Sequence, residues 1–419
     1  MRLWHRFGYA LFAACILLLE LGCGDQYRPV ANPIIGPGGQ PQLTHYAYVV
    51  SNNPTGSGSA MQLNVSGDSV TSVQTTGLGS NYESFLSTST AAVFVTNGGD
   101  DTVSEFNVTV TGSVLTINLL TGSHPVAVTS TLAGVMYVLN SRPNVVCPNA
   151  GSISTISTAT LVVSSTVCVG LNPIAMVQAA GGGRVFVINQ GDNSVSVYDP
   201  PSNTVVGTFT MSSGLGLNPV SLAASADGSY IFVVNEGDGV NPGALDIIAA
   251  ATNNFSTLPS VPLGVKPTFA FFDPTLVRLY VTNSGSGTVS VFDASNINVN
   301  NSPAIPLLGT TAVGTNPVGV TALPNGTRFY VANSVSNNVT DVSATSFAVL
   351  NTIPLPAGSN PVYIASEPTS SKIYVANQSS VSIIQTSSDV LSTSVPAPAQ
   401  NSNCTASCAL QQPVMIITH

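Results

Sequence analysis

Charge is the scarcest property of this sequence. Only 6% of its 419 residues are charged, with nine Lys and Arg against eighteen Asp and Glu and a net charge of −9. So few basic side chains exclude a surface that tracks phosphate groups, and we therefore expect no nucleic-acid partner. The shortage of Lys, Glu and Arg argues against a helical bundle, and the 44% hydrophobic content excludes charge-driven disorder. An all-β protein with a surface of hydroxyl and amide groups remains.

Residues and motifs of common catalytic chemistry are also scarce. The only Trp is Trp4, and the four His are widely spaced at His5, His45, His124 and His419. The sequence contains no GxSxG, HExxH, phosphate-loop or CxxCH motif. A haem or quinone cofactor is therefore disfavoured, and an enzyme is not the favoured interpretation.

Residues 1–22 have the features of an export signal. Two Arg precede an unbroken apolar run from Phe7 to Leu19, which is too short to span a bilayer comfortably as a helix. The run leads into Leu-Gly-Cys at Cys23, which resembles a bacterial lipobox whose Cys carries the lipid. Residues 23–45 are rich in Pro and Gly, as is typical of a tether. We predict a lipid-anchored protein of the cell envelope, at the outer membrane, in the periplasm or at the cell surface, with secretion as the alternative.

From residue 46 onward the sequence repeats itself. An apolar run ending in Asn recurs at an average interval of about 46 residues. These Asn residues are Asn52, Asn97, Asn140, Asn189, Asn235, Asn283, Asn333 and Asn377. A second motif, a Pro followed by apolar residues, keeps the same period.

Each repeat contains four short runs that are typical of strands. In the repeat that starts at Pro317, we expect strands over 318–323, 328–333, 339–342 and 347–353, the first two joined by an Asn-Gly turn. The second run is apolar throughout, which predicts burial on both faces. A four-stranded sheet packed on both faces by its own copies is typical of a β-propeller blade.

The length of the repeat region favours eight blades in a single domain of residues 46–419. Eight repeats would average about 47 residues, close to the observed interval, whereas the alternative of seven would need about 53. The region begins with a second strand, Tyr46 to Asn52, and finishes with a first strand, Pro413 to Thr418. We expect these two segments to share one composite blade that closes the ring.

The repeats resemble the YVTN β-propeller family. Tyr280-Val281-Thr282-Asn283 is followed by Val289-Ser290-Val291-Phe292-Asp293, and Phe186 to Asn189 is followed by Val195 to Asp199. The resemblance covers residues 46–419 and implies an exported surface or envelope protein. A related group, the lactonase-type propellers, shares the early pattern and includes hydrolases acting on sugar lactones. Trp-Asp propellers are excluded because the only Trp lies in the signal segment.

The four Cys of the repeat region fit an oxidising compartment. Cys147 follows strand two, and Cys168 closes strand four of the same repeat. Strands two and four run parallel, so both Cys emerge on one face and a disulfide is expected. Cys404 and Cys408 are expected to close a second, small loop. A zinc site is disfavoured because no paired CxxC motif or His ligand accompanies these residues.

Candidate binding residues follow from position in the repeat. The residues before the recurring Pro should lie at one mouth of the channel: Asn81, His124, Asn172, Asn218, Lys266, Asn316, Asn360 and Gln412. The simpler interpretation is that Asn before Pro makes a good turn. His124 and Lys266 break the pattern, and Glu83 falls on an innermost strand. These three are the residues that a catalytic site would use.

Carboxylates in the loops after strand two should lie on the same face. They are Asp100, Asp101, Asp192, Glu236 and Asp238. Such groups could hold a hard cation such as calcium, although turn residues facing water are the simpler interpretation. We expect no other cofactor. Basic residues open strand two on the opposite face, at Arg184, Arg278, Arg328 and Lys372, where a repeated position is most simply structural.

We therefore predict a non-catalytic binding scaffold. Its partner would be an envelope protein, a glycan or a small molecule on one propeller face, because loops rather than the fold carry function in such scaffolds. We expect a monomer that touches the membrane only through its lipid. The alternative is a lactonase-like hydrolase, which would need Glu83 and His124 within hydrogen-bond reach at the channel mouth.

Overall fold

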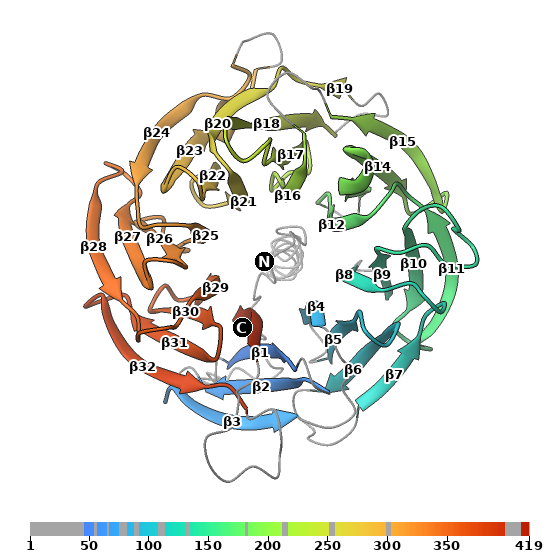
Figure 1. Cartoon of the computed structure of the whole chain (residues 1–419), viewed down its shortest axis with the longest axis horizontal. Coiled ribbons are helices and arrows are strands. Elements are labelled where there is room, and N and C mark those ends of the chain that lie inside the picture. The colour runs from blue at the N-terminus through green and yellow to red at the C-terminus, as the bar shows by residue number, and fades with distance from the viewer. Residues whose placement is uncertain are drawn as a thin grey trace, which may run out of the picture.

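A computed structural model describes most of residues 46–418, which form eight separate sheets arranged as a ring around a central channel (Figure 1). Residues 54–56, 65–66, 75–81, 88–91, 108–113, 131–133, 181–182, 212–216, 251–255, 299–302 and 399–411 are not described, and for 46, 52, 72, 74, 82–87, 107, 130 and 412–418 only the backbone is. The predicted eight-bladed, all-β propeller is confirmed. Within the described residues there is no α-helix, and no helix is long and apolar enough to cross a membrane.

Blades are numbered here in chain order, and each runs from an innermost strand at the channel to an outermost strand on the rim. Blade 1 contains β1 (Tyr46–Asn52), β2 (Ser59–Asn64), β3 (Ser69–Gln74) and β33 (Gln412–Thr418). Blade 2 contains β4 (Tyr82–Ser87), β5 (Ala92–Asn97), β6 (Thr102–Asn107) and β7 (Val114–Asn118). Blade 3 contains β8 (Pro125–Ser130), β9 (Val135–Asn140), β10 (Ser152–Ser157) and β11 (Val162–Cys168). Blade 4 contains β12 (Pro173–Gln178), β13 (Val185–Asn189), the 3-10 turn η1 (Gln190–Asp192), β14 (Ser194–Asp199) and β15 (Thr204–Thr210).

The remaining blades follow the same plan, except that the outer strand of blade 5 is split in two. Blade 5 contains β16 (Pro219–Ala224), β17 (Tyr230–Asn235), β18 (Pro242–Ala249), β19 (Ser256–Thr257) and β20 (Val261–Val265). Blade 6 contains β21 (Pro267–Asp273), β22 (Arg278–Asn283), β23 (Thr288–Asp293), the 3-10 turn η2 (Ala294–Asn296) and β24 (Leu307–Ala312). Blade 7 contains β25 (Pro317–Ala322), β26 (Arg328–Asn333), β27 (Asn338–Ser343) and β28 (Val349–Pro354). Blade 8 contains β29 (Pro361–Ser366), β30 (Lys372–Asn377), β31 (Ser380–Gln385) and β32 (Val390–Pro396).

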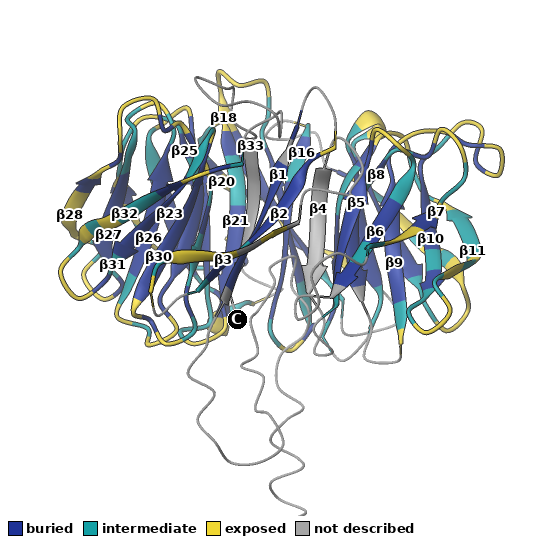
Figure 2. Ribbon diagram, turned by 90° about the horizontal axis from the view of Figure 1, so that it is seen from below, coloured by how far each residue is buried: buried dark blue, intermediate teal, exposed yellow. Residues whose placement is uncertain are grey.

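The second strand of each blade is buried on both faces, as its apolar sequence predicts. In β26, Phe329 and Val331 pack against blade 6, whereas Tyr330 and Ala332 pack against blade 8. All four side chains are fully buried. The hydrophobic core is therefore a set of layers between blades, and exposure is concentrated in the loops and on the outermost strands (Figure 2).

The ring is closed by the composite blade that the sequence predicts. β33 pairs antiparallel with β1, with Ala47 opposite Thr418 and Val49 opposite Ile416. The sheet order is β3-β2-β1-β33, so the innermost strand comes from the C-terminal end of the repeat region and the other three from its beginning. The two segments lie side by side in Figure 1.

The recurring Asn at the end of strand two is a buried hydrogen-bond donor. Its side chain is fully buried in the seven blades where it is described, at Asn97, Asn140, Asn189, Asn235, Asn283, Asn333 and Asn377. In Asn283, for example, Nδ2 donates to Thr288 Oγ1 and Ser290 Oγ of strand three, both at 3.1 Å. A Ser or Thr partner recurs in six blades, while Asp246 takes this role in blade 5. The repeat motif thus fixes the turn after strand two.

This Asn also explains a glycine that stands three residues before the recurring Pro. Gly264 N donates to Asn283 Oδ1 at 3.0 Å, and a Cβ on Gly264 would lie 2.7 Å from Asn283 Cγ. We expect Gly264→Ala to lower the free energy of unfolding by about 2 kcal/mol, because the side chain and the buried amide cannot both fit. Urea denaturation would measure the loss. Gly183→Ala is the control, since its Cβ would meet atoms no closer than 3.4 Å; equal midpoints for the two variants would contradict the explanation.

Three of the four basic residues at the start of strand two contact the next blade, whereas Arg184 pairs with Asp199 of its own blade. Arg278 of blade 6 donates to the Ala344 carbonyl of blade 7, and Lys372 of blade 8 forms an ion pair with Asp68 of blade 1. Asp68 lies in the turn between β2 and β3, so the second contact joins blade 8 to the composite blade. The position is structural, as its repetition indicated. We call the side formed by the turns between strands one and two and between strands three and four the clamp face.

Arg328 makes the most extensive of these contacts. Its Nη1 lies 3.0 Å from Asp341 Oδ2 in blade 7 and 2.9 Å from Asp389 Oδ2 in blade 8. Tyr330 OH donates to Asp389 Oδ1 at 2.8 Å. Burial, and next the charge of Asp389, raise the pKa of Asp341 to about 6, against the opposing effect of Arg328. One guanidinium thus holds two carboxylates together across the blade boundary.

Candidate functional site

The loops after strand two and the connections into the next innermost strand form the opposite side of the ring, which we call the loop face. The residue before the recurring Pro has a left-handed backbone in six blades, with φ between 43° and 74° at His124, Asn172, Asn218, Lys266, Asn316 and Asn360. Asn tolerates this conformation better than most residues. The backbone thus accounts for the preference for Asn, as the turn interpretation proposed. Asn81 lies outside the described residues, and Gln412 is described by its backbone alone.

Three of these amides also bond within their own blade. Asn316 Nδ2 donates to Ser334 Oγ at 2.6 Å, and Asn360 Nδ2 donates to Gln378 Oε1 at 2.9 Å. Asn218 Nδ2 donates to Glu236 Oε2 at 2.7 Å. In each case the partner is the residue directly after strand two. The innermost and second strands of a blade are therefore tied together at the channel mouth.

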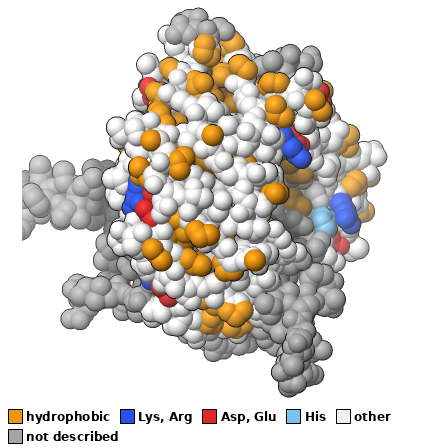
Figure 3. Space-filling view, turned by 60° about the vertical axis from the view of Figure 1, so that its left-hand side comes forward, with side chains coloured by type: hydrophobic (Ala, Val, Ile, Leu, Met, Phe, Trp, Pro, Cys, Tyr) orange, Lys and Arg blue, Asp and Glu red, His pale blue; other side chains and the backbone are white. Residues whose placement is uncertain are grey.

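Lys266 extends the last of these pairs into the next blade. Its Nζ lies 3.8 Å from Glu236 Oε1, and its side chain is 50% exposed while that of Glu236 is 19% exposed. Asn218, Glu236 and Lys266 thus form a small polar cluster over the boundary between blades 5 and 6. Such an exposed ion pair contributes little stability, so its groups are available to a ligand at small cost. Charged side chains are sparse and scattered elsewhere on the visible surface (Figure 3).

His124 contacts blade 2, not Lys266. Its Nδ1 lies 2.7 Å from the Gly98 carbonyl, and because a carbonyl only accepts, Nδ1 is the donor of this hydrogen bond. The Asp101 carboxylate accepts from the backbone N–H groups of Gly122 and His124, both at 2.7 Å. Glu83 lies on β4, whose side chains are outside the described residues, and so is the contact with His124 that the hydrolase alternative requires.

The predicted carboxylates lie in separate loops on three blades. Asp192 accepts from Ser194 Oγ at 2.6 Å and from Leu171 N at 3.0 Å. Asp238 accepts from the backbone N–H groups of Val240 and Asn241, and bonds of this kind lower its pKa. Within the described part of the chain no three or more metal-binding side chains come together, so Asp100, Asp101, Asp192, Glu236 and Asp238 do not converge there.

The channel wall of blades 4 to 6 contains a cavity of about 210 Å³. It is lined by Ile174 and Ala175, Val220 to Ala223, and Thr268 to Phe272. Each of the three strands has a β-bulge directly after its Pro, and the extra residues are Ile174, Val220 and Thr268. Bulges re-aim side chains near barrel rims, here toward the channel. The lining contains no titratable side chain, so the cavity offers packing but no acid–base chemistry.

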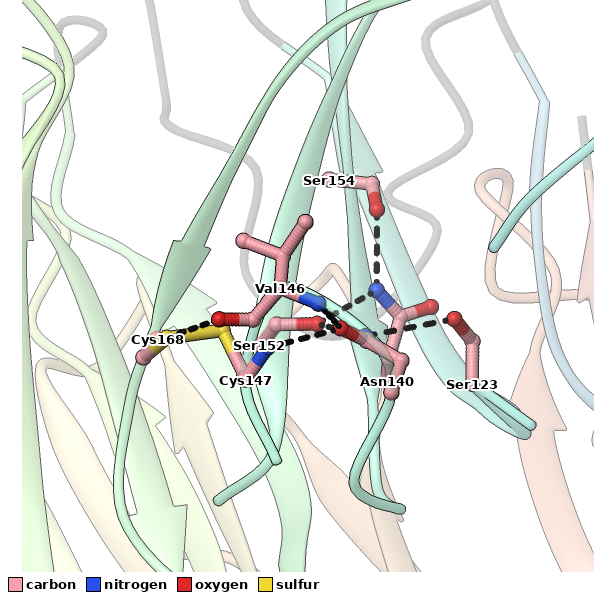
Figure 4. The surroundings of a disulfide bond; sticks show 8 residues. Ser123, Asn140, Val146, Cys147, Ser152, Ser154 and Cys168 are labelled. Carbon is pink, nitrogen blue, oxygen red and sulfur yellow. Dashed lines mark hydrogen bonds between the residues drawn. A yellow bond between two sulfur atoms is a disulfide. The ribbon is translucent and has the colours of Figure 1, made fainter. Parts of the chain in front are cut away.

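Among the loops of the loop face that the structure describes in full, the loop between β9 and β10 departs most from the repeat. The predicted disulfide Cys147–Cys168 is present, with 5.5 Å between the Cα atoms, and it ties this loop to the end of β11 (Figure 4). The predicted pair Cys404 and Cys408 lies outside the described residues, as does Cys23.

Removing this disulfide should measurably weaken the protein. The bond closes a segment with a sequence separation of 21, and cross-linking such a segment stabilises the fold by about 3 kcal/mol. We expect the double variant Cys147→Ser, Cys168→Ser to lose that amount in urea denaturation. Wild-type protein unfolded in the presence of a thiol reductant should give the same midpoint as the variant. A variant as stable as the oxidised wild type would show that the bond has no such effect.

Sequence reasoning missed the exposed apolar residues of the loop face. They are Val145, Val146, Leu171, Leu217, Val240 and Val335, with exposed fractions between 38% and 81%. A signal was present in the repeat spacing, because the interval from Asn97 to Asn140 is shorter than that from Asn140 to Asn189, which contains the long loop.

The fold is shared with β-propellers of known structure, including lactonase-type ones. Apo AztD from Citrobacter koseri is 13% identical over 90% of this chain and 98% of its own, with a TM-score of 0.60. A putative 6-phosphogluconolactonase from Bacteroides uniformis is 13% identical over 90% of this chain and 100% of its own, with a TM-score of 0.55. The dihydro-heme d1 dehydrogenase NirN is 10% identical over 94% of this chain and 79% of its own, with a TM-score of 0.66. No protein-family model and no curated protein matches the sequence.

Proposed function

We propose that this protein is an exported, lipid-anchored β-propeller of the YVTN type that binds a partner on its loop face without catalysing a reaction. The observation that carries the proposal is the difference between the two faces. Exposed large apolar residues occur in the described loops of the loop face, and none occurs in the described turns of the clamp face. A face that carries exposed apolar residues while the opposite face carries none in its described turns is the better candidate for an interaction surface.

Charge supports the same assignment. The basic residues of the clamp face hold blades together, and little of their charge is left for a partner. The loop face instead has five carboxylates against two basic side chains, Arg142 and Lys266, in its described loops. It can therefore offer apolar contacts together with a negative field.

The position of the first strand in the ring supports the proposed lipid anchor. β1 begins at Tyr46 on the clamp face and runs toward the loop face, where it ends at Asn52. A tether formed by residues 23–45 would join the ring on the clamp face. A lipid on Cys23 would then hold the clamp face toward the membrane and present the loop face to partners.

The lactonase alternative has support from the fold of neighbours such as the putative 6-phosphogluconolactonase, and it needs an acid–base pair. The described cavity in the channel wall has no titratable group, so this alternative assigns the pair to Glu83 and His124 at the channel mouth. Assaying the mature protein on a panel of sugar lactones, with Glu83→Gln as control, separates the two proposals. Turnover that Glu83→Gln abolishes would overturn the non-catalytic assignment.

Anchoring is tested by the mass of the protein extracted from membranes. The Leu-Gly-Cys ending predicts a mature chain that starts at Cys23 with added acyl mass. Cys23→Ser should release the protein from the membrane fraction. A soluble wild-type product that begins after Cys23 would contradict the lipid anchor.

A further inference from the structure

We propose that the loop between β9 and β10, residues 141–151, is the docking element for a protein partner with an apolar pocket bordered by a carboxylate. The inference rests on the proposed function and deepens it. It names the part of the loop face that makes first contact and the chemistry of the surface that it fits.

The loop is longer than the blade requires. It spans residues 141–151, whereas the equivalent loops of blades 2, 6 and 7 span only 98–101, 284–287 and 334–337. Those short loops connect the same two strands with the same Asn at the end of strand two. Blade geometry therefore does not explain the additional residues. Compact surface loops of this length whose ends lie close together are frequently functional.

The loop is also held in one conformation. Asn144 is only 7% exposed, and its Oδ1 accepts from the N–H groups of Val146 and Cys147 at 3.0 and 2.9 Å. Its Nδ2 donates to Ser152 Oγ at 3.0 Å. The disulfide Cys147–Cys168 fixes the other side of the tip (Figure 4). A loop ordered before binding loses little conformational entropy in a complex, so its contacts contribute more fully to affinity.

The side chains at the tip are those of a binding anchor. Val145 is 81% exposed and Val146 is 50% exposed, between a buried Asn144 and a buried Cys147. Burying both valines would strengthen binding by roughly 100-fold. Arg142, which is exposed, is the only charged residue of the loop. A partner that fits this element therefore has an apolar pocket and a carboxylate at its border, which Arg142 can contact in a charge-assisted hydrogen bond.

The shape and charge of the tip favour a protein over other ligands. Small molecules bind in concave sites, whereas these valines project from a loop. A membrane-binding segment would need a larger apolar face and several basic residues, and this loop has two valines and one Arg. The tip is thus suited to enter a pocket on another protein.

Site-specific photocrosslinking in cells tests the proposal on the full chain. The probe is p-benzoylphenylalanine, placed at Val145 in one variant and at Val390 in a matched control. Val390 is a 56% exposed valine on the outermost strand of blade 8. We expect a discrete protein adduct from position 145 and none from position 390, and mass spectrometry then identifies the crosslinked protein.

That protein, once purified, should bind wild-type propeller in solution. We expect Val145→Ser with Val146→Ser to weaken binding about 100-fold, and Arg142→Glu to weaken it about 10-fold and alter its salt dependence. Val390→Ser should leave the affinity unchanged. An unchanged affinity in the valine double variant, no adduct at position 145, or an adduct only with lipid or a second copy of this chain would overturn the proposal.

A third probe position separates this inference from the proposed function. Lys266 lies at the channel mouth on the same face, and its side chain is 50% exposed. An adduct from position 266 without one from 145 overturns the role of the loop and leaves the binding face intact. No adduct from either position overturns both.

Discussion

A chain that stops at Gln411 should lose the closure of the ring. The deletion removes β33, which pairs with β1 and also packs against the innermost strands of blades 2 and 8. The buried residues Val49 and Val50 of β1 would be uncovered along an unpaired strand edge. We expect the free energy of unfolding to fall by roughly 5 kcal/mol or more, a large part of the stability of a typical domain. Thermal unfolding and size-exclusion chromatography should show a lower midpoint and aggregation.

The matched control removes one residue and ends at Thr418, so that β33 remains complete. Its thermal midpoint should equal that of the full chain. A truncated protein that ends at Gln411, stays monomeric and melts at the same temperature would contradict closure through β33.

Arg328→Met should also produce a large loss of stability. The substitution keeps the apolar stem but leaves Asp341, which is fully buried, and Asp389 without their shared cation. Removing one partner from such a buried pair is strongly destabilising, and since Arg328 is 22% exposed we expect about 3 kcal/mol at pH 7.5. Urea denaturation measures the loss. Arg184→Met is the control, because the ion pair of Arg184 with Asp199 lies within its own blade.

The loss should depend on pH in a defined direction. The pKa of Asp341 in the folded protein is raised to about 6, above its ordinary value of 3.8, so this group favours folding most below pH 4 and loses that contribution as pH rises through 6. Without Arg328 the pKa rises further, so the defect should shrink between pH 7.5 and pH 5. Adding Asp341→Asn should restore at least half of the stability at pH 7.5. Equal losses at both pH values, with no rescue, would exclude a charge effect.

The architecture could be predicted because a propeller blade is a local unit repeated along the chain. The repeat period, the turn residues and the apolar second strand together indicated eight blades, the composite blade and the Cys147–Cys168 bond. All three features depend on the position of a residue within its own repeat, which the sequence shows directly. The predicted strand boundaries are wrong where contacts with a neighbouring blade determine the local conformation. Phe347, for example, was expected to begin strand four, but β28 starts at Val349. Phe347 has a left-handed backbone, and its ring packs under Arg278 of blade 6.

The candidate site was less predictable for the same reason. The sequence singled out the positions before the recurring Pro, yet it did not reveal that Asn218 bonds to Glu236 or that Glu236 contacts Lys266 of the next blade. The second of these contacts depends on the angle between adjacent blades. The extra residues of the loop over 141–151 were visible as a longer interval, but their exposure and rigidity required the structure.

The pairing of β1 with β33 also sets the order of events during synthesis. β33 is made after every other strand of the ring, so the inner edge of β1 stays unpaired until then. In a chain that is threaded across a membrane N-terminus first, the ring can be completed only after β33 has crossed. If the chain is exported as proposed, the earlier blades must wait on the far side as an open arc with an exposed edge, which is the stage at which a chaperone there would matter most.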